Sequence, residues 1–564
     1  MGHHHHHHHD HEHVPEVLDA SVPDSELSPA DVSRRGFLRG AGLLGAGAAA
    51  SVVTSASAAS AAPGDDPVAT TASGRPVQGG YQWLAGDHHI HTQYSSDAMY
   101  RVVDQAQHAR AYGLDWMVIT DHGSVTHAKI GVEKVNPDIV AARAQLRDLL
   151  LFQGLEWNIP AAEHGTVFVT PGPHEVAVLK EFENGYDGSV RNAGAPTPAN
   201  EALAVAGIQF LGEQVRQRRV DGALFLANHP ARRGVDSPHE IRAWRDADPT
   251  IAVGMEGAPG HQAAGIPAPQ GPGSGRGFYN SSPSASSFPG YPLESYRTWG
   301  GFDWMTSTVG GLWDSLLAEG KPWWISANSD SHVTYLDTAT RGPDSNFEAN
   351  GKYNDPVYGG QVLNTAGDFW PGYYSRTHVG ATAFGYRAVM AGLRAGRVWV
   401  DHGRLIKALD VRVHAADQDR AAGAPLGGVL RVKRGTRVVV TIHIDLADIP
   451  NWAQFVPTLA RVDVITGAVT GPVADGDTFT APTAKVVKSF EVAAGTGRVS
   501  FRYALGDVDG SFYVRLRGTD GKRSATGLMG AAVDPHGPAL DVVGAADPWN
   551  DLWFYANPTF VLPK

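Results

Sequence analysis

The sequence predicts an α/β domain built from strand–helix units, followed by an all-β domain. Three observations lead to this prediction. From residue 81 to about residue 403, short apolar runs alternate with amphipathic stretches, which favours a parallel sheet or barrel. From residue 404 onward, apolar and polar residues alternate without helical spacing, as in an antiparallel β-sandwich. The chain also has 564 residues, which is too long for one ordinary domain.

The composition is that of a globular chain, and it limits the available chemistry. Hydrophobic residues make up 42% of the chain and charged residues 18%, which is typical of folded domains with ample core. The net charge is −12, and no basic cluster is interleaved with aromatic residues, so a stable nucleic-acid complex is not expected. There is no cysteine. Disulfides, thiolate nucleophiles and Cys-ligated zinc are therefore excluded, and histidine and carboxylates remain as ligands for any metal.

Three segments precede the predicted domains. Residues 1–32 contain a histidine run that is either an expression tag or a native arm. Residues 33–61 hold paired arginines, a weak apolar stretch and small residues at candidate cleavage sites, and they resemble a twin-arginine export signal. The apolar stretch is too short and too rich in glycine for a stable membrane span. Residues 62–80 are expected to be a flexible linker. We therefore expect the twin-arginine machinery to export a mature protein without a membrane span to the periplasmic, cell-wall or extracellular space.

The elements of both domains can be assigned from their patterns. Residues 98–112 carry apolar residues at helical spacing and end at a glycine, which predicts a helix. In the first domain, apolar runs predict buried strands at 116–119, 149–153, 166–169, 223–227 and 323–326. In the second domain, alternating runs predict strands at 408–413, 429–432, 436–444, 460–464, 486–492, 498–503 and 511–516. The aromatic segment at 547–555 either packs against the first domain or binds a sugar or a partner.

Candidate metal ligands lie where the apolar runs of the first domain stop. His89 and His91 are two residues apart at the end of such a run, so their side chains would project together. Neutral imidazoles suit a divalent metal ion. In barrels of parallel strands, the chemistry collects at this end of the strands. Any one of these residues alone could be a turn, a cap or a solvated charge, but their shared placement indicates one site. The other candidates at strand ends are Asp121, His122, Glu156, His164, His229, Asp330 and His332.

These motifs resemble those of the polymerase-and-histidinol-phosphatase (PHP) family of metal-dependent phosphoesterases. Residues 89–92, 120–122, 156 with 164, and 329–332 stand in the order of the family's four motifs, and residues 229–232 are similar to its His-Pro-x-Arg element. The resemblance covers residues 86–332 and extends more loosely to residue 403. It implies a distorted (βα)7 TIM-like barrel at 81–403 with long loop insertions, followed by the β-sandwich domain at 404–564.

The resemblance also implies two or three divalent metal ions. Asp97 stands where many family members have histidine. Asp121 is expected to orient a metal-binding histidine, since such histidines usually donate their other N–H to a carboxylate or carbonyl. Histidine and carboxylate ligands suit Zn, Mn or Fe(II) without choosing among them. The implied ligand sets are His89, His91, Glu156 and Asp330 for the first ion; Glu156 as a bridge, with His164 and His229, for the second; and Asp97, His122 and His332 for the third.

The function expected from these residues is hydrolysis of phosphate mono- or diesters of small molecules outside the cytoplasm. A metal-bridging hydroxide would attack phosphorus in line, with no covalent protein intermediate. Arg232, or alternatively Arg233, would clamp a phosphate oxygen, because the guanidinium fork matches that geometry. His122 or His332 would help to protonate the leaving oxygen when it is not ligated to metal. Two alternatives remain open: a metal-dependent hydrolase of another bond (amide or lactone), and a non-catalytic, metal-stabilised ligand-binding protein.

Two long irregular segments follow strand ends on the proposed active face, at 257–292 and 338–374. Loops of this length are either disordered or functional. We expect them to form a rim that sets the size of the substrate. His402 follows the apolar run 398–400, and it either touches the site or forms a corner between the domains.

Overall fold

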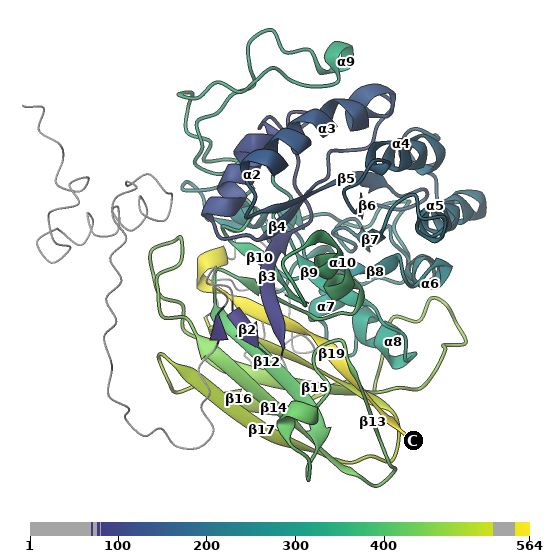
Figure 1. Ribbon diagram of the computed structural model, residues 1–564, viewed down its shortest axis with the longest axis vertical. Helices are drawn as coiled ribbons and strands as arrows, with labels where there is room; N and C mark the ends of the chain where they lie inside the picture. The colour runs from purple at the N-terminus through teal and green to yellow at the C-terminus, as the bar shows by residue number, and fades with distance from the viewer. Residues whose placement is uncertain (1–68, 71–75, 79, 523–546) are drawn as a thin grey trace, which may run out of the picture. The chain divides into compact units, whose positions relative to one another are not determined.

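A computed structural model describes residues 69–70, 76–78, 80–522 and 547–564. The expected His-rich arm (1–32), the twin-arginine signal (33–61) and most of the linker (62–80) lie outside these residues. The described chain is a mixed α/β region with parallel strands, followed by a β-rich region (Figure 1), which confirms the fold class at this level. None of its described helices has the length and apolar character needed to cross a membrane.

Consecutive strands form the core of the α/β region. In the sheet they follow one another in chain order: β3 (Tyr81–Asp87), β4 (Trp116–Ile119), β5 (Leu150–Asn158), β6 (His164–Val169), β7 (Ala223–Ala227), β8 (Ala252–Ala258) and β9 (Trp324–Ala327). The strands β3, β4 and β5 pair in parallel, as do β7, β8 and β9, whereas β6 is antiparallel to both of its neighbours. A parallel bridge between Ile90 and Ser331 joins the segments that follow β3 and β9. The two ends of this series of strands therefore meet where the candidate ligands lie.

Helices cover the outside of these strands (Figure 1). In order, α2 (Val102–Ala111), α3 (His127–Gln145), α4 (Glu175–Tyr186), α5 (Pro198–Arg216) and α6 (Pro238–Ala247) contact β4 to β8. The start of α6 follows local rules: Ser237 and Glu240 form a reciprocal capping box, and a proline stands at the first helical position. Further along the chain are α7 (Trp304–Ser307), α8 (Leu312–Ala318), α9 (Phe347–Asn350) and α10 (Tyr386–Arg394).

The predicted elements agree best with the structure where an apolar run is fully buried. The strands predicted at 116–119 and 223–227 are β4 and β7 with the same bounds. The prediction that the strand at 149–153 stops before Glu156 is wrong, because β5 continues to Asn158. The cause is the antiparallel hairpin with β6, in which Glu156 pairs with Thr166. The helix predicted at 98–112 is shorter and forms α2.

The sheet of the α/β region continues into the β-rich region. From β3 it passes through β10 (Ser375–Ala381), β11 (Val398–His402) and β19 (Trp553–Pro563) to β18 (Phe512–Thr519), β15 (Arg461–Ala468) and β16 (Lys485–Glu491). The short strand β13 (Val429–Val432) pairs with the end of β19, and β2 (Pro76–Gln78) pairs with both β1 (Ala69–Thr70) and β3. A second sheet contains β12 (Ile406–Ala415), β14 (Arg437–Leu446) and β17 (Arg498–Asp507).

The two sheets of the β-rich region share one apolar core. Side chains of β12 and β14 are buried together with side chains of β15, β18 and β19. The aromatic segment at 547–555 leads into β19, and Trp553, Phe554 and Tyr555 are buried. The ring of Tyr555 lies 4.1 Å from the ring of Phe302, which belongs to the α/β region. Trp553 and Tyr555 therefore pack against the α/β region, whereas Phe554 lies in the core of the β-rich region.

Candidate metal centre

The end of β3 is fixed by hydrogen bonds to the segment that follows β9. The carboxylate of Asp87 accepts the backbone N–H groups of His89 and Ser329, each at 3.0 Å. The backbone N–H of His91 donates to the carbonyl of Ser331 at 3.0 Å. Hydrogen bonds within the protein therefore fix the backbone around both histidines, and the two side chains project from a rigid position.

The first group of ligand atoms is fully buried. His89, His91, Glu156 and Asp330 each offer one atom within 4.8 Å of the others. The Nε2 atom of His89 lies 3.0 Å from a carboxylate oxygen of Glu156 and 3.0 Å from Oδ1 of Asp330. The Nε2 atom of His91 lies 3.1 Å from the same Oδ1. The structure thus brings together the set expected for the first ion.

Glu156 lies at the centre of the cluster. Its Oε1 atom is 3.1 Å from Nδ1 of His164 and 3.3 Å from Nε2 of His229. Its Oε2 atom is 3.0 Å from Nδ1 of His122. The expected second set therefore assembles around one carboxylate. His122, which the resemblance places only at the third ion, approaches the same carboxylate.

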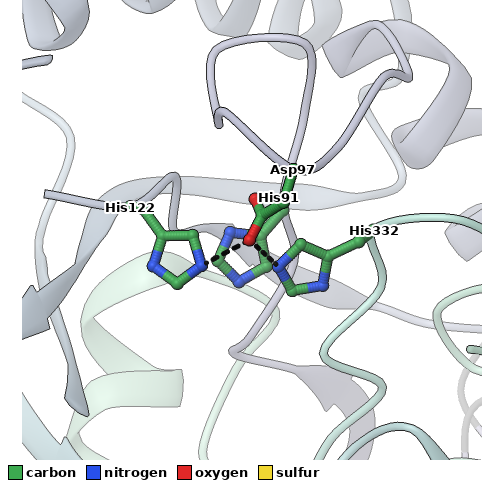
Figure 2. Close-up of side chains that lie close together, drawn as sticks. All are labelled: His91, Asp97, His122 and His332. Carbon is green, nitrogen blue, oxygen red and sulfur yellow. Dashed lines mark ion pairs between the residues drawn. The ribbon is translucent and has the colours of Figure 1, made fainter. Parts of the chain in front are cut away.

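The third group lies at the mouth of the cluster (Figure 2). Asp97 lies between His122 and His332, with its Oδ2 atom 3.1 Å from one Nε2 and 3.6 Å from the other. His91 belongs to the same group, and its ring stacks on that of His332 at 3.8 Å. The side chain of Asp97 is 51% exposed, unlike the buried first group. The structure therefore brings together the three residues expected for the third ion, and it adds the imidazole of His91 to them.

Two buried atoms in the first group fit a metal ion. The Nε2 atom of His91 and the Oδ1 atom of Asp330 lie 3.1 Å apart, and neither makes a well-oriented hydrogen bond with a described residue. Buried polar atoms are nearly always satisfied, so two that converge on one point suggest a ligand between them. Imidazole nitrogen and carboxylate oxygen are ligands for zinc, manganese and iron. The residues present therefore fit divalent ions.

Charge in the cluster is mutually stabilised. Burial opposes ionisation of Glu156, but the histidines around it, chiefly His89 and His164, hold its pKa well below the usual range. Burial likewise opposes ionisation of Asp330, whose pKa His261 and His89 lower. The pKa of His89 is raised against the effect of burial by neighbouring carboxylates, Asp330 first among them. Both carboxylates are thus held ionised, as metal ligation requires.

Glu256 on β8 supports the cluster and was missed in the sequence. Its Oε1 atom lies 2.6 Å from Nδ1 of His89, and its Oε2 atom accepts the backbone N–H of His229 at 2.7 Å. A carboxylate on Nδ1 fixes the tautomer that leaves Nε2 free for a metal. Glu256 is a single carboxylate inside the apolar run of residues 252–258, and no motif there indicates a role.

His261 and Asp368 were also missed as members of the site. The Nε2 atom of His261 lies 2.8 Å from Oδ2 of Asp330, and its Nδ1 atom lies 2.5 Å from Oδ1 of Asp368. Asp368 also accepts the backbone N–H of His332 at 2.6 Å. Both residues come from the long segments at 257–292 and 338–374. The expected rim therefore reaches the ligands themselves.

The structure distinguishes the two arginines. Arg232 lines the cavity at the cluster, and its Nη2 atom lies 3.5 Å from Oε2 of the buried Glu163. Arg233 lies 3.2 Å from the other oxygen of Glu163, but its side chain is 63% exposed. Asp121 accepts hydrogen bonds from the backbone N–H and the hydroxyl of Thr92, so it holds the turn after His91 and not a histidine side chain.

The cluster opens into a cavity of about 440 Å³. Phe278 from the first long segment and residues 365–368 from the second contribute to its wall. His402 is not part of it. That side chain is buried against the rings of Phe302 and Tyr374, which makes it a structural corner.

Comparison with known proteins identifies one domain. Residues 87–193 match the family model described as the PHP domain. The match spans the first three motifs and stops before residues 229–232 and 329–332. Together with the ligand clusters, this domain supports a metal-dependent hydrolase. No curated protein is similar to the chain.

Two solved structures are distantly similar. One is a two-domain protein from Bacteroides vulgatus that contains a predicted PHP-like metal-dependent phosphoesterase: it is 13% identical, the match covers 81% of this chain and 95% of that one, and the TM-score is 0.31. The other is endonuclease Q in complex with a duplex substrate that carries an abasic lesion: it is 18% identical, with coverage of 33% and 46% and a TM-score of 0.19. At these TM-scores, neither similarity supports a conclusion about this chain.

Proposed function

We propose that this protein is a metal-dependent phosphoesterase that hydrolyses mono- or diesters of small phosphorylated molecules. The observation that supports this best is the position of Glu156, whose two oxygens lie within 3.3 Å of nitrogens from five imidazoles. A carboxylate surrounded in this way is suited to bridge two ions. The PHP domain at residues 87–193 is the second support.

Two or three divalent ions (Zn, Mn or Fe) would be bound. The first would be held by the fully buried group with His89 and His91, the second by Glu156 with His164 and His229, and the third by the partly exposed group with Asp97. When bound, such ions lower the pKa of water to near neutrality and neutralise charge on phosphoryl oxygens.

Protein side chains would bind the substrate and orient the metal-binding histidines. Arg232 would hold a phosphoryl oxygen, since its planar fork can donate two parallel hydrogen bonds, and Glu163 keeps it in place. Glu256 would orient His89. The Nδ1 atom of His332 lies 2.8 Å from the carbonyl oxygen of Asp330. Because a carbonyl only accepts, that nitrogen carries the proton and Nε2 presents a lone pair toward Asp97. This tautomer favours ligation by His332 over proton donation to a leaving group.

The proposed enzyme has two domains and an export signal. We propose that residues 81–403 form a distorted (βα)7 barrel with long insertions as the catalytic domain, and that residues 404–564 form a β-sandwich domain. We also propose export by the twin-arginine route, on the basis of residues 33–61. Replacing Arg34 and Arg35 together by lysine would then keep the chain in the cytoplasm of an expressing cell, as fractionation would show. Unchanged export would contradict this part of the proposal.

A substrate panel with metal reconstitution tests the activity. Chain depleted of metal would be reloaded with Mn, Zn or Fe(II) and assayed on 4-nitrophenyl phosphate, bis(4-nitrophenyl) phosphate, a nitroanilide amide and an aryl lactone. We expect metal-dependent turnover of a phosphate ester by the natural sequence and none by Asp330→Ala. Turnover of the amide or the lactone alone would assign a different bond. No turnover with any metal would favour a binding protein.

A further inference from the structure

A second cavity, of about 420 Å³, is lined by Trp83 and Ala85 of β3, and none of the candidate metal ligands contributes to its wall. It shares no lining residue with the cavity at the metal cluster. Its wall is made by β3, β10, β11, the start of β12 and residues 447–449. The volume is within the range of about 300–1,000 Å³ that small-molecule pockets occupy.

Asp401, which two lining residues contact from behind the wall, is fully used by its neighbours. Arg376 donates to both oxygens of the buried Asp401, from Nε at 3.1 Å and from Nη2 at 2.7 Å. His378 approaches the same carboxylate with its Nε2 atom at 2.9 Å. Although burial opposes ionisation of Asp401, Arg376 and His378 lower its pKa to about 2. The Nη1 group of Arg376 takes no part in these bonds and remains available to a ligand.

Arg404 brings a second guanidinium to the cavity without a carboxylate of its own. Within the described part of the chain, no acidic side chain forms an ion pair with it, and its guanidinium packs over the ring of Trp452 at 5.2 Å. Burial and the nearby Arg376 lower its pKa to about 10. Gly403 and Arg404 both have a left-handed φ, of 59° and 60°, and for arginine this conformation is strained. Arg404 is half-buried, and an anion that paired with it would offset the cost of its partial desolvation.

Two buried indoles form part of the cavity wall. Trp83 and Trp399 are 7% and 1% exposed, and neither Nε1 atom finds an acceptor among the residues described. The acidic side chains that line the cavity are already engaged: Asp448 pairs with Lys407 at 2.7 Å, and Asp115 accepts a backbone N–H at 3.0 Å. The cavity therefore offers the guanidinium groups of Arg376 and Arg404 and an apolar wall, but few free acceptors.

We propose that this cavity binds a small organic carboxylate, whose carboxylate group pairs with Arg404 and Arg376 while its apolar part lies against Trp83 and Trp399. A guanidinium matches a carboxylate in two parallel hydrogen bonds. The ring of His378 stacks on Trp399 at 3.6 Å, so one indole face is covered and the ring is held in place for a ligand. This site is independent of the proposed hydrolysis, because it uses none of the metal ligands.

Titration with benzoate tests the proposal, with benzamide as a neutral probe of nearly the same shape. Calorimetry on the full chain should show one benzoate site, with benzamide bound at least about tenfold more weakly, as expected for loss of a charged hydrogen bond. Arg404→Gln should weaken benzoate binding by about tenfold or more. Arg387→Gln is the matched control and should bind as the natural sequence does, because that exposed arginine pairs with Asp221 and does not line this cavity.

Two further measurements distinguish benzoate binding in this cavity from binding at the metal cluster and from loss of folding. Asp330→Ala, which disrupts the metal cluster, should bind benzoate unchanged; loss of binding would place the carboxylate at the metal cluster and overturn the proposal. Thermal melts would show whether Arg404→Gln is folded, and Trp83→Phe, which reduces the aromatic wall of the cavity, is a second variant that should also weaken benzoate binding. Equal binding of benzoate and benzamide, or unchanged affinity in folded Arg404→Gln, would also overturn it.

Discussion

The two cavities associated with β3 have opposite chemistry. The candidate metal cluster beyond the end of the strand gathers carboxylates and imidazoles. The second cavity, lined by Trp83 and Ala85 of the strand itself, gathers arginines and indoles. In each place the charged side chains indicate the charge of the ligand that would fit: a cation at the carboxylates and an anion at the arginines. One strand can therefore serve two unrelated sites.

Glu156→Ala should have the largest effect and should leave the second cavity intact. Removing the central carboxylate should reduce metal affinity by more than the roughly 10- to 100-fold typical of residues behind the ligands. Activity should fall to background, and elemental analysis of the purified variant would measure the loss. Benzoate affinity should stay unchanged. A folded variant that retained its full metal content would contradict the central role proposed for Glu156.

Arg232→Ala should reduce kcat by on the order of 10²-fold, as expected for loss of one electrostatic stabiliser. Its ion content should stay unchanged, since no ligand is removed. Arg233→Ala is the matched control, because that side chain pairs with the same Glu163 but is largely exposed. Steady-state kinetics on the best substrate of the panel would compare them. Equal losses in the two variants would contradict the assignment of Arg232.

Acid should lower the free energy of unfolding by protonating Asp401, which lies beside the second cavity. Its pKa is about 2 in the folded chain against 3.8 ordinarily, so its stabilising contribution is present above about pH 4 and is lost as the pH falls toward 2. The pH-dependent part of the free energy of unfolding should be about 2.5 kcal/mol, at roughly 1.4 kcal/mol per pKa unit. Urea unfolding of the natural sequence and Asp401→Asn between pH 7 and pH 2 would measure it. The difference in the free energy of unfolding between the two proteins should narrow below pH 4. A difference that stays constant with pH would contradict this prediction.

Glu256→Gln should have the smallest effect of the four, about a tenfold loss of metal affinity, at the low end for an outer partner of a metal-binding histidine. Glutamine keeps the shape of the side chain and one acceptor oxygen for His89, but it loses the charge. Titration of metal-depleted chain with Zn or Mn would give the affinity. An unchanged affinity would show that Glu256 has only a structural role.

Much of the candidate metal cluster could be predicted because most of its proposed ligands lie in short motifs that follow apolar runs. All of the expected ligands, from His89 to His332, converge in the structure. Glu256 could not be found in this way, because a lone carboxylate in an apolar strand has no spacing to mark it. His261 and Asp368 lie in irregular segments, where no periodicity predicts the path of the backbone.

Element bounds were predictable only where local pattern and tertiary pairing agree. The strands β4 and β7 are short, apolar and buried, and the sequence alone delimits them. The end of β5 is decided by its hairpin partner β6, a contact that an apolar run does not encode. Asp121 illustrates the same limit: its place beside His122 suggests a histidine partner, whereas the fold brings Thr92 to it.

The pairing of β11 with β19 has a consequence for how the chain must be made. Val400 faces Tyr555 in this pair, so a strand next to the α/β region gains its neighbour only after the intervening β-rich segment has been synthesised. Contacts this distant in sequence form late, since closing long loops costs entropy. Until then the edge of β11 is open to pairing with other chains. Shortened versions that stop near residue 403 would keep that edge exposed and are poor candidates for soluble expression.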